Sequence, residues 1–64
     1  MEMYIRQGFH YKVKLKSKKE KVMKDIIIYY YGIEIFHQVT NIRIDADVIF
    51  QNVCKQYVED FFSK

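Results

Sequence analysis

The sequence has a single cysteine and therefore no means of forming a disulfide within the chain. Cys54 also has no ligand-like spacing to His10 or His37, so the sequence predicts neither a disulfide framework nor a metal cluster. Apolar packing alone must hold a chain of 64 residues, which is close to the lower size limit for a stable fold. We expect one domain over residues 1–64, without cofactor or metal.

Long hydrophobic runs are also missing. The longest apolar stretch, residues 26–31 continued by Gly32 and Ile33, is too short to cross a bilayer. The first residues lack the basic and apolar regions of a secretory signal. A lone cysteine is consistent with a reducing compartment. These absences predict a cytoplasmic protein without membrane contact.

Proline is absent and arginine, alanine and glycine are scarce, whereas lysine, isoleucine and the aromatic residues are abundant. AT-rich codons produce this bias and supply lysine at surface positions by default, so the placement of the lysines is more informative than their number. Residues 1–24 hold eight basic and two acidic residues, and residues 25–64 hold three basic and six acidic ones. This charge separation suggests a polyanionic partner or head-to-tail self-association.

Alternation of apolar and polar residues predicts two hairpins, each built from two short strands. Gln7-Gly8 joins the first pair, and Thr40-Asn41 joins the second pair. The expected strands span residues 3–6, 9–16, 33–39 and 42–45.

A helix is expected between the hairpins. Ser17 and Glu20 have the spacing of a capping box, apolar residues recur at helical spacing after them, and Gly32 can end the helix. We therefore predict a helix over residues 18–31, with a strand as the competing interpretation because residues 26–31 have high β propensity. A second helix begins at Asp45 or Asp47 and carries one apolar stripe, which includes Cys54.

The order strand, strand, helix, strand, strand, helix predicts an α+β fold (ββαββα). Its four-stranded, antiparallel-type sheet would carry two helices on one face. This is a ferredoxin-like split βαβ arrangement with its last strand moved to the amino terminus. The comparison is architectural and implies no function.

In this arrangement the sheet face opposite the helices combines cations with aromatic rings, as in some proteins that bind single-stranded nucleic acid. Further lysines lie in the first turn of the expected helix, where they oppose the helix macrodipole and would favour a bound polyanion. The alternative is an ordinary solvent-exposed face with no binding role, in which lysine is frequent because of the codon usage. The predicted nucleic-acid surface comprises Tyr4, Arg6, His10, Lys12, Lys14, Lys16, Phe36 and Arg43 of the sheet face and Lys18, Lys19 and Lys21 of the helix start.

Two arginines are too few for extensive bidentate contacts to bases. We therefore expect binding to the phosphate backbone, sensitive to salt and with little sequence preference. DNA and RNA are equally compatible with this pattern.

A protein partner is the alternative. Several apolar residues fall outside the main helical stripes, and a two-layer domain of this size cannot bury them all. They fit a homodimer, or a small inhibitor or regulator of the kind that phages and other mobile elements encode, although some of them could simply flank the core. The residues of this expected interface are Ile28, Tyr29, Tyr31, Val48, Val58 and Phe62.

Catalysis is not expected. No serine, cysteine or carboxylate is spaced to form a relay with His10 or His37. Ser17 and the pair Asp45 and Asp47 are explained as helix caps. We therefore predict a binding protein that is not an enzyme and has no small-molecule substrate.

Overall fold

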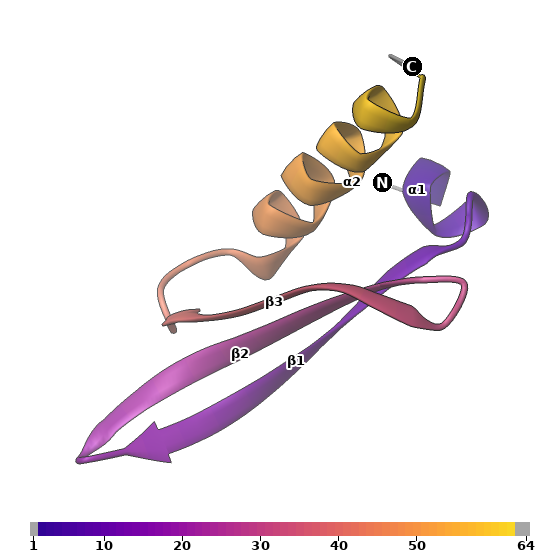
Figure 1. Ribbon diagram of the computed structural model, residues 1–64. Helices are drawn as coiled ribbons and strands as arrows, with labels where there is room; N and C mark the ends of the chain where they lie inside the picture. Colours follow the sequence, from indigo (N-terminus) through magenta and orange to yellow (C-terminus); the bar gives the residue numbers. More distant parts are fainter. Residues whose placement is uncertain (1, 63–64) are drawn as a thin grey trace.

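The structure, a computed structural model, describes residues 2–62, without the side chains of Glu2, Met3, Lys18 and Phe62. It is an α+β fold in which three antiparallel strands, in the order β1-β2-β3, are accompanied by two helices (Figure 1). The elements are α1 (Glu2–Arg6), β1 (Phe9–Lys18), β2 (Lys21–Tyr30), β3 (Ile33–Asn41) and α2 (Ala46–Phe62).

Both hairpins close with two-residue turns. Lys19 and Glu20 have φ of 47° and 67° between β1 and β2, and Tyr31 and Gly32 have φ of 50° and 81° between β2 and β3. Positive φ at both positions gives the type I′ turn, whose twist matches that of paired strands. Gly32 adopts this conformation without a steric cost, whereas Lys19, Glu20 and Tyr31 each carry a Cβ in it.

The core lies between α2 and one face of the sheet. Tyr4 of α1 closes one end of it, because its ring meets the rings of Phe9 and Phe50 edge-on at centroid distances of 6.0 and 6.5 Å. The helical spacing of the α2 residues in this core confirms the predicted apolar stripe. The buried cluster comprises Phe9, Ile26 and Ile28 from the sheet and Ala46, Phe50 and Cys54 from α2.

Two polar contacts position the start of α2. The Asp45 carboxylate accepts a hydrogen bond of 3.0 Å from the backbone amide of Asp47, which identifies Asp45 as the N-cap and confirms the predicted capping. Lys24 Nζ donates to the carbonyl oxygen of Ile44 at 2.7 Å and so ties the preceding loop to β2.

The first predicted strand is wrong: residues 3–6 lie in α1. Amides of Gln7 and Gly8 donate to the carbonyl oxygens of Tyr4 and Ile5, which closes the helix, and Gly8 follows with φ of 106°. Four alternating residues are too few to separate a strand from one helical turn, and burial of the Tyr4 ring favours the helix.

The predicted helix over residues 18–31 is also wrong, since these residues contain the turn and β2. The competing interpretation of a strand is the right one for residues 26–30, because this β-branched and aromatic run fits a central strand, whereas Tyr31 lies in the turn. Gly32 is compatible with both interpretations, because a glycine with positive φ is common in type I′ turns and also just after the last residue of a helix.

The predicted strand over residues 42–45 is replaced by a turn. The Asn41 side chain accepts a hydrogen bond from the amide of Arg43 at 2.8 Å, and the Asn41 carbonyl accepts one from the amide of Ile44 at 3.1 Å. With three strands among the described residues, the four-stranded sheet and its permuted ferredoxin-like arrangement are not confirmed.

Candidate nucleic-acid interface

One face of β1 carries a row of basic side chains. Phe9 and Tyr11 point toward α2, so the alternate residues occupy the opposite face, which neither helix covers in Figure 1. Alternate residues of a strand are about 6.6–6.8 Å apart. All four side chains are exposed, and we refer to them as the lysine face: His10, Lys12, Lys14 and Lys16.

Tyr29 of β2 supports the first half of this face. Its ring stacks on that of His10, with centroids 5.2 Å apart and an angle of 18° between the planes. Lys12 Nζ lies 5.7 Å from the centroid of the same ring, within cation–π range. Because its neighbours already engage Tyr29, the ring orders the lysine face and is a poor platform for stacking a base.

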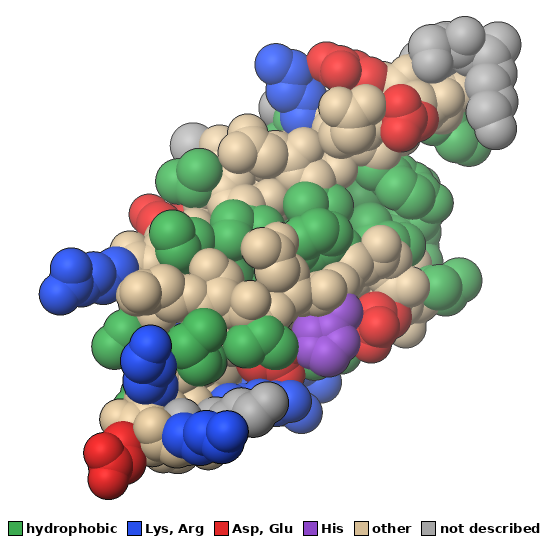
Figure 2. Space-filling view, turned by 60° about the vertical axis from the view of Figure 1, so that its left-hand side comes forward, with side chains coloured by type: hydrophobic (Ala, Val, Ile, Leu, Met, Phe, Trp, Pro, Cys, Tyr) green, Lys and Arg blue, Asp and Glu red, His purple; other side chains and the backbone are tan. Residues whose placement is uncertain are grey.

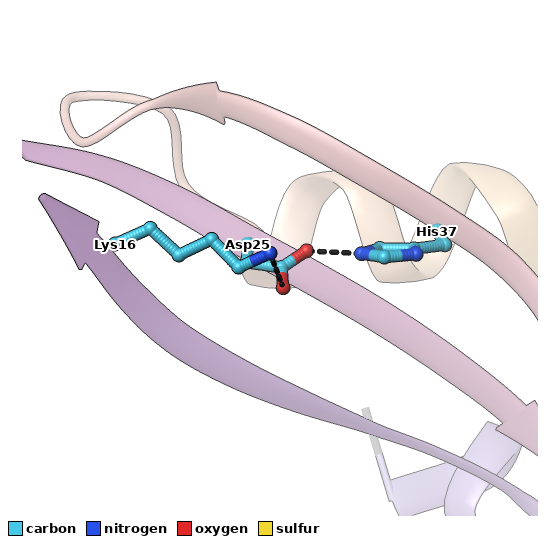
Figure 3. A network of polar contacts seen from close by, with 3 residues as sticks. All are labelled: Lys16, Asp25 and His37. Carbon is cyan, nitrogen blue, oxygen red and sulfur yellow. Dashed lines mark hydrogen bonds and ion pairs between the residues drawn. The ribbon is translucent and has the colours of Figure 1, made fainter. Parts of the chain in front are cut away.

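The second half of the face is built around Asp25 of β2, which is only 3% exposed. Figure 3 shows its carboxylate between Lys16 of β1 and His37 of β3. His37 Nε2 donates a hydrogen bond to one carboxylate oxygen, and Lys16 Nζ lies 3.4 Å from the other. One acidic residue thus joins all three strands on this face.

Burial of the Asp25 carboxyl by itself raises its pKa. The hydrogen bond from His37 and the positive charges of His37 and Lys16 act in the opposite direction and outweigh burial, so the pKa is lowered. Asp25 therefore stays ionised near neutral pH and offsets part of the positive charge around it. Lys14, by contrast, forms no ion pair with any described residue.

The other residues of the predicted surface lie elsewhere. Tyr4 packs in the core, Arg6 ends α1, Phe36 packs against the core, and Arg43 lies in the turn after β3. The structure therefore brings together a smaller set than the sequence predicted. This follows from the change in secondary structure, since alternation places residues on one face only within a strand.

Lys19 and Lys21 are exposed at the β1–β2 turn, at the end of the lysine face. The helix-dipole reason for choosing them is wrong, because no helix begins there. The side chain of Lys18 lies outside the described ones.

The residues of the expected protein interface have different environments. Ile28 is fully buried, Val58 packs against the core, and the Tyr29 ring stacks on His10 of the lysine face, whereas Tyr31 and Val48 are exposed. The side chain of Phe62 also lies outside the described ones. Burial thus removes Ile28 from any surface, whereas Tyr31 and Val58 line one hollow of the molecule.

Sequence reasoning missed the contact between Asp25 and His37. The two residues lie on neighbouring strands, and a register shift between Ile28 and Tyr29 places them on the same sheet face. The two-residue turn alone would pair Ile26 with His37 and so place His37 on the face opposite Asp25.

Three further observations concern the thiol, metal ligands and helix length in the described part of the chain. Burial raises the pKa of the Cys54 thiol to about 11, which suits a core residue. The described residues contain no His, Cys, Asp and Glu cluster that could hold a metal ion. Within residues 2–62, neither helix is long and apolar enough to cross a membrane.

Comparisons with known protein families, with curated proteins and with solved structures give no match for this chain.

Proposed function

We propose that this protein binds the phosphate backbone of nucleic acid through the lysine face. The observation that carries the proposal is the row of exposed side chains on β1, from His10 to Lys16, on a sheet face that neither helix covers. A row of lysines at regular spacing along one strand matches a linear polyanion better than a compact anion.

The wider charge distribution supports this orientation. Most of the Lys and Arg side chains visible in Figure 2 gather toward the end of the molecule that holds the β1–β2 turn. Figure 2 shows acidic side chains toward the carboxyl end of α2, the part of the helix to which Glu59 belongs. Such a field steers a polyanion to the hairpin and away from the helix.

The composition of the face predicts a low sequence preference. Its charged groups are lysines, which meet phosphates as point charges, and both arginines lie in other parts of the molecule. Each phosphate neutralised contributes a slope of about −0.7 to −0.9 in the logarithm of the binding constant against the logarithm of salt concentration. Three lysine contacts would therefore give a slope of roughly −2 to −3.

Fluorescence anisotropy with labelled single- and double-stranded oligonucleotides tests this function. Lys14→Gln should weaken binding and make the salt slope shallower by about one phosphate contact. Lys55→Gln on α2 removes the same charge outside the face and is the matched control. The triple change of Lys12, Lys14 and Lys16 to Gln should abolish binding at micromolar protein.

Two results would contradict the proposal. One is the absence of salt-sensitive binding to either oligonucleotide at micromolar protein and low salt. The other is an equal loss for Lys14→Gln and Lys55→Gln, since that would show a response to net charge alone.

A further inference from the structure

The described fold is more open than its mass requires. Its accessible surface is 5165 Å², whereas a compact monomer of 7.9 kDa exposes about 4,400 Å². Its radius of gyration is 12.8 Å, against about 10.7 Å for a compact domain of this length. The molecule measures 44 × 19 × 19 Å, and the β1–β2 hairpin extends beyond α2 (Figure 1).

An apolar patch lies on the part of the hairpin that α2 leaves uncovered. Val13, Leu15 and Val22 share the side of the sheet that also carries Ile26 and Ile28 of the core. All three are exposed, and Leu15 is 69% exposed. We refer to Val13, Leu15 and Val22 as the hairpin patch.

A second apolar surface lies at the other end of the molecule. A hollow of about 270 Å³ opens there between the sheet, the β2–β3 turn and the last turns of α2. Phe61 is 71% exposed at its rim. We refer to this site as the aromatic hollow, and its lining residues are Gln7, Phe9, Tyr30, Tyr31, Tyr57, Val58 and Phe61.

We propose that a second copy of this chain covers both surfaces, with the hairpin patch of each protomer packed against the aromatic hollow of the other. The two surfaces lie at opposite ends of an elongated molecule, so they cannot pack against each other within one chain. A two-fold axis makes both contacts at once and closes the assembly as a dimer.

The amount of surface fits this partner. The excess over a compact monomer is roughly 750 Å², and each partner of a standard-size interface buries about 800 Å². With a core cluster of six buried residues among those described, the chain also gains from association, because small domains often depend on it for stability.

Charge favours the same arrangement. The hairpin end carries Lys19 and Lys21, while Glu59 lies on α2 next to Val58 of the aromatic hollow. Antiparallel protomers bring these opposite charges together twice, whereas a parallel pair would place like charges side by side. The lysine face lies on the other side of the sheet, so this dimer does not depend on nucleic-acid binding.

Sedimentation equilibrium over a range of protein concentrations tests the dimer. Leu15→Gln and Phe61→Gln should each raise the dimer dissociation constant at least about tenfold, since each change removes two buried contacts in a two-fold dimer. Val39→Gln is the matched control, because Val39 is 47% exposed on the sheet face away from the hairpin patch, where it pairs with Asp25 across β2 and β3. The dimer should be retained in this variant.

Disulfide cross-linking tests the same contact between protomers without the Gln variants, and so still applies if one of them unfolds. Leu15→Cys and Phe61→Cys chains, mixed under oxidising conditions, should give mixed disulfide dimers faster than either chain alone. The buried Cys54 can stay in place. A monomer at all concentrations, a dimer unaffected by both Gln variants, or no preference for the mixed disulfide would overturn the proposal.

Discussion

His37 and Asp25 form a hydrogen bond across the open side of the sheet, and this contact places an ionised carboxylate in the middle of a basic surface. The carboxylate belongs to the central strand and is almost inaccessible to water. Its two partners come from the two outer strands, so one group links the sheet across its width.

Acid should destabilise the fold through Asp25. Its pKa is lower in the folded chain than in the unfolded chain, where a value of about 3.9 applies. The unfolded state therefore binds the proton first, and the stability that Asp25 contributes is lost as the pH falls from about 4 through the folded pKa. Urea unfolding between pH 2 and 7 measures this, and Asp25→Asn should flatten the profile in that window.

Glu59→Gln provides the control for this pH profile, because it removes an exposed carboxylate from α2. Its profile should follow that of the natural chain. An unchanged profile for Asp25→Asn would show that the ionised network does not contribute to stability.

The β1–β2 turn should be improvable. Lys19 and Glu20 occupy left-handed positions that type I′ turns usually fill with Asn and Gly. The double change Lys19→Asn and Glu20→Gly should raise the free energy of unfolding by about 1 kcal/mol, since each non-glycine residue in this conformation costs about that much. Thermal unfolding followed by circular dichroism measures it, and a lower midpoint would contradict the assigned turn.

Gly8 should not tolerate a side chain. A Cβ built on it would lie 2.6 Å from the ring of Tyr31, and its φ of 106° is unfavourable for other residues. Gly8→Ala should lower the free energy of unfolding by about 1–3 kcal/mol. Adding Tyr31→Ala should recover only part of the loss, because the ring contact disappears while the backbone strain remains. Full recovery in this double-mutant cycle would argue against the strain.

Cys54 should be chemically inert in the folded protein. Burial raises the pKa of its thiol to about 11, and only the thiolate reacts with alkylating agents. Iodoacetamide at pH 8 should modify it slowly in buffer and rapidly in urea, as followed by mass spectrometry. Similar rates under both conditions would show that the thiol is accessible.

Sequence reasoning identified the elements whose patterns are long. Eight alternating residues were enough to predict β1, and the apolar stripe with its aspartate cap was enough to predict α2. It failed where two structures share one signal: Gly32 fits a helix end and a type I′ turn equally well, and the order of the whole sheet follows from that choice.

The same difference separates the parts of the candidate site. Lys12, Lys14 and Lys16 share a face because of alternation within one strand, which a sequence displays directly. The contact of Asp25 with His37 depends on the register between two strands, and that register includes a shift between Ile28 and Tyr29 that alternation of residue types does not indicate.

The two tight turns also bear on how quickly the chain folds. Every strand pairs with its neighbour along the chain, and each connection is only two residues long. The sheet therefore has a low contact order for a protein rich in β structure. Because the connections are short, little loop-closure entropy is lost before the sheet contacts form. Either hairpin can form within about 1–10 μs, and the third strand can then pair with its exposed edge. We therefore expect folding on the order of milliseconds or faster, with a slower step only where protomers must meet.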